Sequence, residues 1–156
     1  MDPVVGWRVW DCLVEDGLLR SVFQDDVWPA GERFEARCRR QAAIYIAGRE
    51  CSTAPRAACC CGIYAAHNQD DLSSFSRYEK TWGTRNQAVE VVGTVSLWGH
   101  IIQHEAGWRA QYAYPYALWV KPPRHGTHSR DVVELMCSEV AAKLRDTYTV
   151  DVGVLR

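Results

Sequence analysis

The chain lacks long hydrophobic runs and an excess of either charge. Nowhere do about 18 consecutive apolar residues occur, which excludes a transmembrane helix. The 18 basic and 19 acidic residues give a net charge of -1, so no global field favours nucleic acid or an anionic membrane. There is also no internal repeat, low-complexity tract or long linker. We therefore expect the 156 residues to form a single domain, residues 1–156, with a core of its own.

The first residues lack the pattern of a secretory signal. Residues 1–8 contain no basic stretch followed by an apolar segment. We therefore expect a cytoplasmic protein that does not associate with membranes. In that reducing compartment the seven cysteines are expected to be thiols or metal ligands rather than structural disulfides.

Cysteine is what the chain has in excess. Three of the seven, Cys59, Cys60 and Cys61, are adjacent, and two more lie upstream in a region rich in loop-forming Gly, Ser, Thr and Pro. A structural Zn²⁺ ion takes four Cys or His ligands that loops bring together. The sequence therefore predicts a zinc site in a Cys-rich loop, with ligands Cys38, Cys51, Cys59 and Cys61 and with His67 or Cys60 as open alternatives.

Other uses of these thiols remain open. Arg56 could lower the pKa of a nearby thiol, and His100 or His104 could act as its base, which would make a nucleophilic or redox centre. The thiols could also form a disulfide on oxidation or have no special role. Cys12 and Cys137 fall within apolar patterns, so we expect both to be small buried core residues.

Period-two patterns predict a mainly antiparallel sheet. Residues 4–14 alternate, Asp16-Gly17 is typical of a hairpin turn, and residues 18–23 return. Residues 89–104 alternate strongly and turn at Gly107 into a second strand, whose pairing Pro115 is expected to end or to place at an edge. A helix over residues 129–146 follows, capped by Ser129. The predicted fold is α+β: a bent antiparallel sheet or small open β-barrel with the C-terminal helix packed on it.

The alternation over residues 89–104 also predicts a binding surface. Trp98, His100 and His104 fall on one face, opposite the apolar face. The return strand adds further polar and aromatic side chains, and an upstream arginine cluster adds positive charge. The predicted binding residues are Trp98, His100, His104, Trp108, Arg109, Tyr112, Arg39 and Arg40.

The function predicted from these features is a non-enzymatic, zinc-stabilised recognition module. Aromatic side chains next to arginines suit base stacking and phosphate contacts, so nucleic acid is the leading partner. A protein–protein interaction module and a small thiol- or His-dependent enzyme are the alternatives. The chain is expected to be a monomer or a homodimer.

Two sequence segments carry a resemblance. Cys59-x-Cys61-Gly62-Ile63-Tyr64-Ala65 is one, and Leu97-Trp98-Gly99 with the later Gly107-Trp108-Arg109-Ala110 is the other. On these segments, most of residues 28–115 resembles a group of small, mainly actinobacterial proteins with no established activity. The resemblance implies one compact cytosolic domain and no particular chemistry. Members tend to have a histidine shortly before the Ala54-Pro55 pair, where this chain has Cys51 and Ser52, so the resemblance leaves the fourth ligand open.

Overall fold

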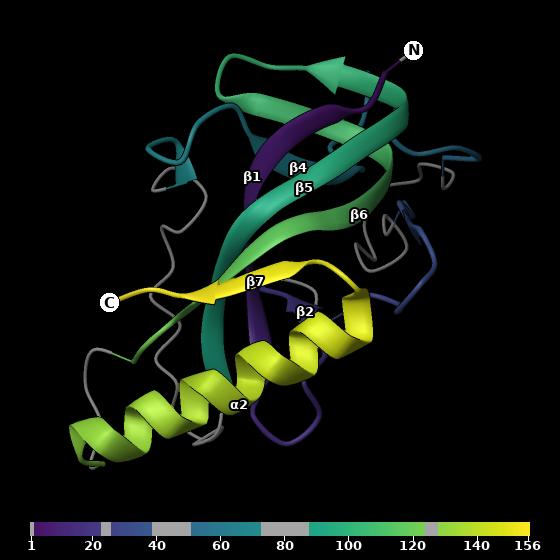
Figure 1. The fold of residues 1–156 in the computed structure, drawn as a ribbon. Coiled ribbons are helices and arrows are strands. Elements are labelled where there is room, and N and C mark those ends of the chain that lie inside the picture. Colours follow the sequence, from purple (N-terminus) through teal and green to yellow (C-terminus); the bar gives the residue numbers. More distant parts are fainter. Residues whose placement is uncertain (1, 23–25, 39–50, 73–87, 124–127) are drawn as a thin grey trace, which may run out of the picture.

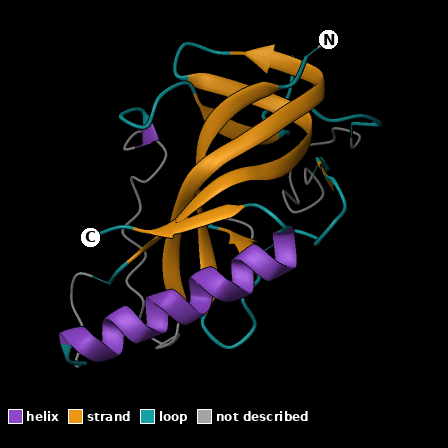
Figure 2. Cartoon of the chain, viewed as in Figure 1, coloured by secondary structure: helices purple, strands orange, loops and turns teal. Residues whose placement is uncertain are grey.

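The computed structural model describes residues 2–22, 26–38, 51–72, 88–123 and 128–156. Its strands are β1 (Val4–Leu13), β2 (Leu19–Ser21), β3 (Phe34–Glu35), β4 (Ile63–Ala66), β5 (Ala88–Gln103), β6 (Gly107–Lys121) and β7 (Asp151–Val154). A long helix, α2 (Arg130–Tyr148), separates the last two strands. This arrangement confirms the α+β prediction (Figure 2).

The seven strands form one strongly bent sheet. β1 pairs with β4 and with β5, and each of these pairs with β6, so the hydrogen bonds close a ring of four strands without making a true barrel. All pairings are antiparallel except that between β6 and β7. The paired β5 and β6 curve through the centre of the molecule, with α2 lying across one side (Figure 1). The bent-sheet prediction is therefore confirmed.

The two long strands bend at irregular positions. A register shift between Trp98 and Ile101 leaves an extra residue in β5, and Gly99 there has φ 78°. A second shift lies beside Pro115, and β6 continues beyond it to Lys121. The expectation that Pro115 ends the pairing was wrong, because Pro115 pairs with Val95 of β5. On the other side of β6, the described partners are β3 up to Ala113 and β7 from Ala117, so Pro115 lies at a local edge, as the alternative expectation had it. A bulge accommodates the missing N–H while the strand goes on pairing, and it increases the local twist.

Helix α2 anchors one end of the sheet. Ser129 is its N-cap, as predicted, and its side chain accepts a hydrogen bond from the N–H of Val132. The helix buries Cys137, Val140 and Leu144, and ends with the fully buried Tyr148. The Tyr148 hydroxyl accepts from the N–H of Leu19 and donates to the carbonyl oxygen of Trp28. The helix thereby ties β2 and the segment before β3 to the core.

The predicted core thiols lie where expected. Cys12 in β1 and Cys137 in α2 are both fully buried within the main hydrophobic cluster. The expected hairpin turn also forms, with Gly17 at φ 62° and its N–H bonded to Leu13. In the described part of the chain, no helix has both the length and the apolar character needed to cross a membrane.

Candidate metal centre

Four cysteines from distant positions converge beside the bent sheet. Their sulfur atoms all lie within 4.8 Å of one another, and the residues are Cys38, Cys51, Cys59 and Cys61. The Sγ atoms of Cys38 and Cys59 are 3.8 Å apart. Tetrahedral coordination with Zn–S bonds of about 2.3 Å requires sulfur atoms about 3.8 Å apart. The predicted convergence is confirmed, and the spacing suits a tetrahedral metal ion.

Strand pairing positions two parts of this cluster against β6. Phe34 of β3 pairs with Ala113, and the N–H of Ala36 donates to the carbonyl oxygen of Gln111, so Cys38 follows a segment held by β6. Cys59 and Cys61 precede β4, which pairs with the beginning of β6. β6 is therefore the common support of ligands that are far apart in the sequence.

The turn between Cys61 and β4 requires glycine. Gly62 has φ 130°, a backbone conformation that other residues rarely adopt. A Cβ atom at this position would lie 2.9 Å from Cβ of Pro55 and 3.0 Å from Cβ of Arg109. Glycine therefore lets the Cys-rich loop, residues 51–62, approach β6 closely.

A buried arginine lies under this loop. Arg109 of β6 is only 4% exposed. One guanidinium nitrogen, Nη1, donates hydrogen bonds to the carbonyl oxygens of Cys59, Cys61 and Arg56. The Nε atom of Arg109 donates to Nε2 of His104 at 2.7 Å. These bonds connect the backbone at two candidate ligands to the sheet.

The cluster favours one thiolate. The backbone N–H of Cys61 stabilises the charged form of Cys59, and the side chains of Cys61, Cys38 and Cys51 reinforce this effect, so the pKa of Cys59 falls to about 6. Burial instead raises the pKa of Cys51, to about 12, and that of Cys61. A metal ion that binds all four sulfurs must therefore displace protons from Cys51 and Cys61.

The two alternative ligands lie outside the group. Cys60 is exposed, and its carbonyl oxygen accepts from the Tyr64 hydroxyl. His67 packs on Trp108 with ring centroids 4.1 Å apart, and its Nε2 donates to the carbonyl oxygen of His104. Among the described residues, the converging set is therefore the four cysteines that the sequence predicted.

Comparisons with known proteins add no assignment. No protein-family model, curated protein or solved structure matches this chain. Four close sulfur atoms could hold a metal ion, and thiolates suit soft or borderline ions such as Zn²⁺.

Five of the predicted binding residues fall into two separate groups. His104, Trp108 and Arg109 belong to the network beside the Cys-rich loop. Trp98 and Tyr112 face each other across β5 and β6, with ring centroids 6.1 Å apart. The bulge at Gly99 separates the two groups, so the single alternating face expected for Trp98, His100 and His104 is not continuous. His100 is exposed at the bulge, and its N–H donates to the Gln111 side chain.

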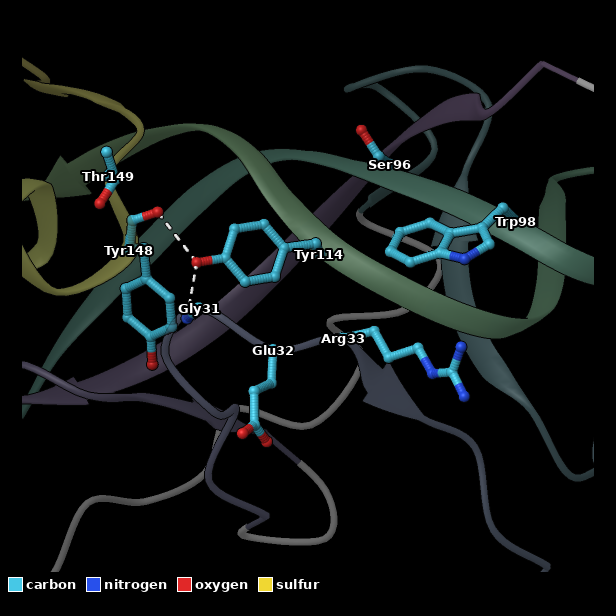
Figure 3. A pocket seen from close by; sticks show the side chains of 8 residues that line it. All are labelled: Gly31, Glu32, Arg33, Ser96, Trp98, Tyr114, Tyr148 and Thr149. Carbon is cyan, nitrogen blue, oxygen red and sulfur yellow. Dashed lines mark hydrogen bonds between the residues drawn. The ribbon is translucent and has the colours of Figure 1, made fainter.

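Trp98 borders an open pocket of about 580 Å³. Ser96 and Trp98 of β5 lie beside Tyr114 of β6, while Glu32 and Arg33 project from the segment before β3 (Figure 3). The Arg33 guanidinium lies 4.0 Å from the centre of the Tyr112 ring. The remaining lining residues are Gly31, Tyr148 and Thr149. We call Trp98, Tyr112 and Arg33 the aromatic surface.

Only part of the expected arginine cluster can be placed. Arg39 and Arg40 lie outside the described residues. Arg33, Arg37 and Arg56 are exposed. Sequence reasoning assigned no particular role to Arg33 and did not foresee the burial of Arg109. The local sign for Arg109 was a charge inside a mainly apolar and aromatic strand.

Thiol reactivity should divide the cysteines into three classes. In the native protein, Cys60 should be alkylated first because it is exposed. Burial raises the pKa of Cys12 to about 12 and also raises that of Cys137, so both should react only after unfolding. If the four clustered thiols hold a metal ion, they should become reactive when a chelator removes it. Mass spectrometry of peptides after timed alkylation measures this order, and rapid native alkylation of Cys12 would contradict the described core.

Proposed function

We propose that this chain is a zinc-stabilised, non-enzymatic binding module and that its ligand is single-stranded nucleic acid. The convergence of four sulfur atoms carries the zinc part of the proposal. The aromatic surface carries the recognition part. The two parts are independent, and each has its own test.

The packing around the four cysteines supports a structural role for zinc. Among the described residues, the small hydrophobic cluster that they form consists of Cys and Ala side chains: Cys38, Ala54, Cys59 and Cys61, with Ala36 and Cys51 packed against them. Such small side chains bury little apolar area, so they offset little of the entropy lost when a loop becomes ordered. Structural zinc contributes on the order of 10 kcal/mol to the folding of small sites. A bound ion would supply the stabilising free energy that this small cluster does not gain from burial of apolar area.

The same arrangement argues against a catalytic metal. Catalytic zinc sites keep one coordination position open for water or substrate, whereas four protein sulfurs complete a tetrahedron. With all four thiols acting as ligands, none remains as a nucleophile. This closed donor set favours the structural role.

The aromatic surface supports a nucleic-acid ligand. Trp98 and Tyr112 are partly exposed, and Arg33 is exposed beside them. Every base has an aromatic face, so stacking on Trp98 would tolerate any sequence, and arginine would bind phosphate. Two further arginines are exposed and add positive charge: Arg37, next to Cys38, and Arg56, within the Cys-rich loop. Glu32 and Glu35 lie among these arginines, so we expect moderate affinity and a marked salt dependence.

Binding should depend on Trp98. Loss of one stacked base costs about 1–3 kcal/mol, so Trp98→Ala should weaken binding of a labelled single strand of about 12 nucleotides roughly 5- to 150-fold. Fluorescence anisotropy measures this effect. Binding by the unaltered protein should weaken as salt is raised from about 50 to about 200 mM.

Tyr116→Ala is the matched control. Tyr116 is 61% exposed on β6 and does not line the pocket, so its replacement should leave affinity unchanged. Equal affinities of Trp98→Ala and the unaltered protein would show that the aromatic surface is not the binding site. If the unaltered protein does not bind at low salt, the nucleic-acid part fails, and a protein ligand becomes the alternative.

A further inference from the structure

Arg109 is a buried cation whose contacts in the described residues are neutral. Its guanidinium group donates to three backbone carbonyl oxygens and to one imidazole nitrogen. None of the ion pairs between described residues includes it. Buried charges in proteins are usually paired, since taking an unpaired charge out of water costs several kcal/mol. The position of Arg109 therefore calls for a nearby negative charge.

We propose that Arg109 is the counter-charge of the metal centre and the residue that positions two of its ligands. This inference rests on the proposed zinc site. Four thiolates around a divalent cation carry a net charge of -2, and Arg109 donates hydrogen bonds to the backbone of two of those four residues, Cys59 and Cys61. The positive charge of Arg109 then partly neutralises the centre, and the negative centre in turn stabilises the buried guanidinium.

The backbone contacts add a geometric role. Nη1 of Arg109 donates hydrogen bonds to the carbonyl oxygens of Cys59 and Cys61, which flank the exposed Cys60. The same nitrogen donates to the carbonyl oxygen of Arg56. That oxygen also accepts a hydrogen bond from the N–H of Cys59, which closes the turn between Arg56 and Cys59. Arg109 thus holds both sides of the Cys-x-Cys segment at a fixed distance from β6. A closely spaced ligand pair needs such support, because the intervening Cys60 is exposed and buries little surface.

His104 completes the arrangement by orienting the guanidinium. Its Nε2 accepts from Nε of Arg109, so the proton of the neutral ring is on Nδ1. The His104 carbonyl oxygen accepts from His67, whose ring packs on Trp108. The side chains of His67, His104 and Arg109 therefore connect the hairpin end of β5 and β6 to the Cys-rich loop. Of these residues, Arg109 is the one that donates hydrogen bonds to the backbone of Cys59 and Cys61.

This role differs from contact with nucleic acid. Arg109 is 4% exposed, whereas Arg33, Arg37 and Arg56 are exposed. We therefore assign Arg109 to the metal centre and the phosphate contacts to the exposed arginines. Replacing Arg109 should change metal affinity, and replacing Arg33 should change nucleic-acid affinity.

The test compares zinc affinity in matched variants by competition with a chromogenic chelator. Loss of a residue that orients metal ligands typically lowers metal affinity about 10- to 100-fold. Arg109→Lys keeps the charge but loses the array of backbone contacts, so we expect a loss near the lower end. Arg109→Gln loses both the charge and these contacts, so its zinc affinity should fall by about 100-fold or more. Arg33→Gln, which removes an exposed arginine, should bind zinc as tightly as the unaltered protein.

A spectroscopic readout separates positioning from general destabilisation. With Co²⁺ in place of zinc, thiolate-to-metal absorption reports the ligand set, and we expect Arg109→Gln to perturb this spectrum while tryptophan fluorescence of the core stays unchanged. If Arg109→Gln does not fold, His104→Ala, which removes only the acceptor for Nε, provides the second variant, with an affinity loss of about 10-fold.

The outcomes distinguish the inference from the proposed function. If the unaltered protein holds no zinc, the metal centre itself is refuted. If it holds zinc and Arg109→Gln binds it equally tightly, only the role of Arg109 is refuted; where Arg109→Gln does not fold, equally tight binding by His104→Ala refutes that role. If Arg109→Lys and Arg109→Gln lost equal zinc affinity, the counter-charge role would be refuted. The backbone contacts of Arg109 would then account for the whole loss.

Discussion

Replacing Cys61 by serine should release the metal and unfold the Cys-rich loop. The substitution removes one of four converging sulfur atoms and leaves three, which cannot complete a tetrahedral site. We expect zinc affinity to fall by more than the roughly 100-fold that loss of an outer partner costs. In the described part of the chain, small Cys and Ala side chains pack around the site, and we expect this packing alone not to keep the loop ordered. Amide hydrogen exchange over residues 51–62 should therefore accelerate strongly, together with loss of zinc.

Cys60→Ser provides a control at the adjacent position. Cys60 is exposed and outside the converging set, so its replacement should leave the zinc content and the hydrogen exchange of the loop unchanged. If Cys60→Ser and Cys61→Ser lost zinc equally, the ligand set would be wrong. If neither lost zinc, the metal would bind elsewhere.

Replacing Trp28 by alanine should have the largest effect on global stability. Trp28 is 1% exposed, stacks on Phe34 with ring centroids 4.6 Å apart, and meets Trp10 edge-on. Truncation of a buried tryptophan costs about 3–5 kcal/mol. It would also leave Ser21 without the hydrogen bond from the indole N–H. Urea denaturation should show this loss, and zinc affinity should fall as well because Phe34 begins the strand that leads to Cys38.

Trp28→Phe separates ring packing from the hydrogen bond. Phenylalanine keeps a ring against Phe34 and loses mainly the bond to Ser21, so the cost should be smaller, on the order of 1–2 kcal/mol. Tyr116→Ala, at an exposed position, should stay within about 0.5 kcal/mol of the unaltered protein. A Trp28→Ala variant as stable as the Tyr116 variant would contradict the described core.

Local patterns predicted the regular elements well. Alternation predicted β1, β5 and β6, and the cap Ser129 with an apolar stripe at helical spacing predicted α2. These signals are local, because each strand or helix buries one face. The C-terminal strand β7 was not predicted, since its parallel pairing with β6 depends on how α2 returns the chain to the sheet.

The binding surface was less predictable. One extra residue at the bulge near Gly99 reverses which side chains share a face, so Trp98 and His104 fall in different surroundings. The four clustered cysteines could be proposed because sulfur is rare and has few uses, even though their spacing was unusual. The contacts of Arg109 could not be predicted, because they join residues about 50 positions apart along the chain.

The zinc K-edge X-ray absorption spectrum of the purified protein tests the central claim most directly. The four sulfur atoms predict about one zinc ion per chain, surrounded by four sulfur scatterers at about 2.3 Å. Protein that contains no zinc after purification from zinc-replete cells without a chelator would contradict the account. A zinc ion surrounded mainly by nitrogen or oxygen would contradict it equally.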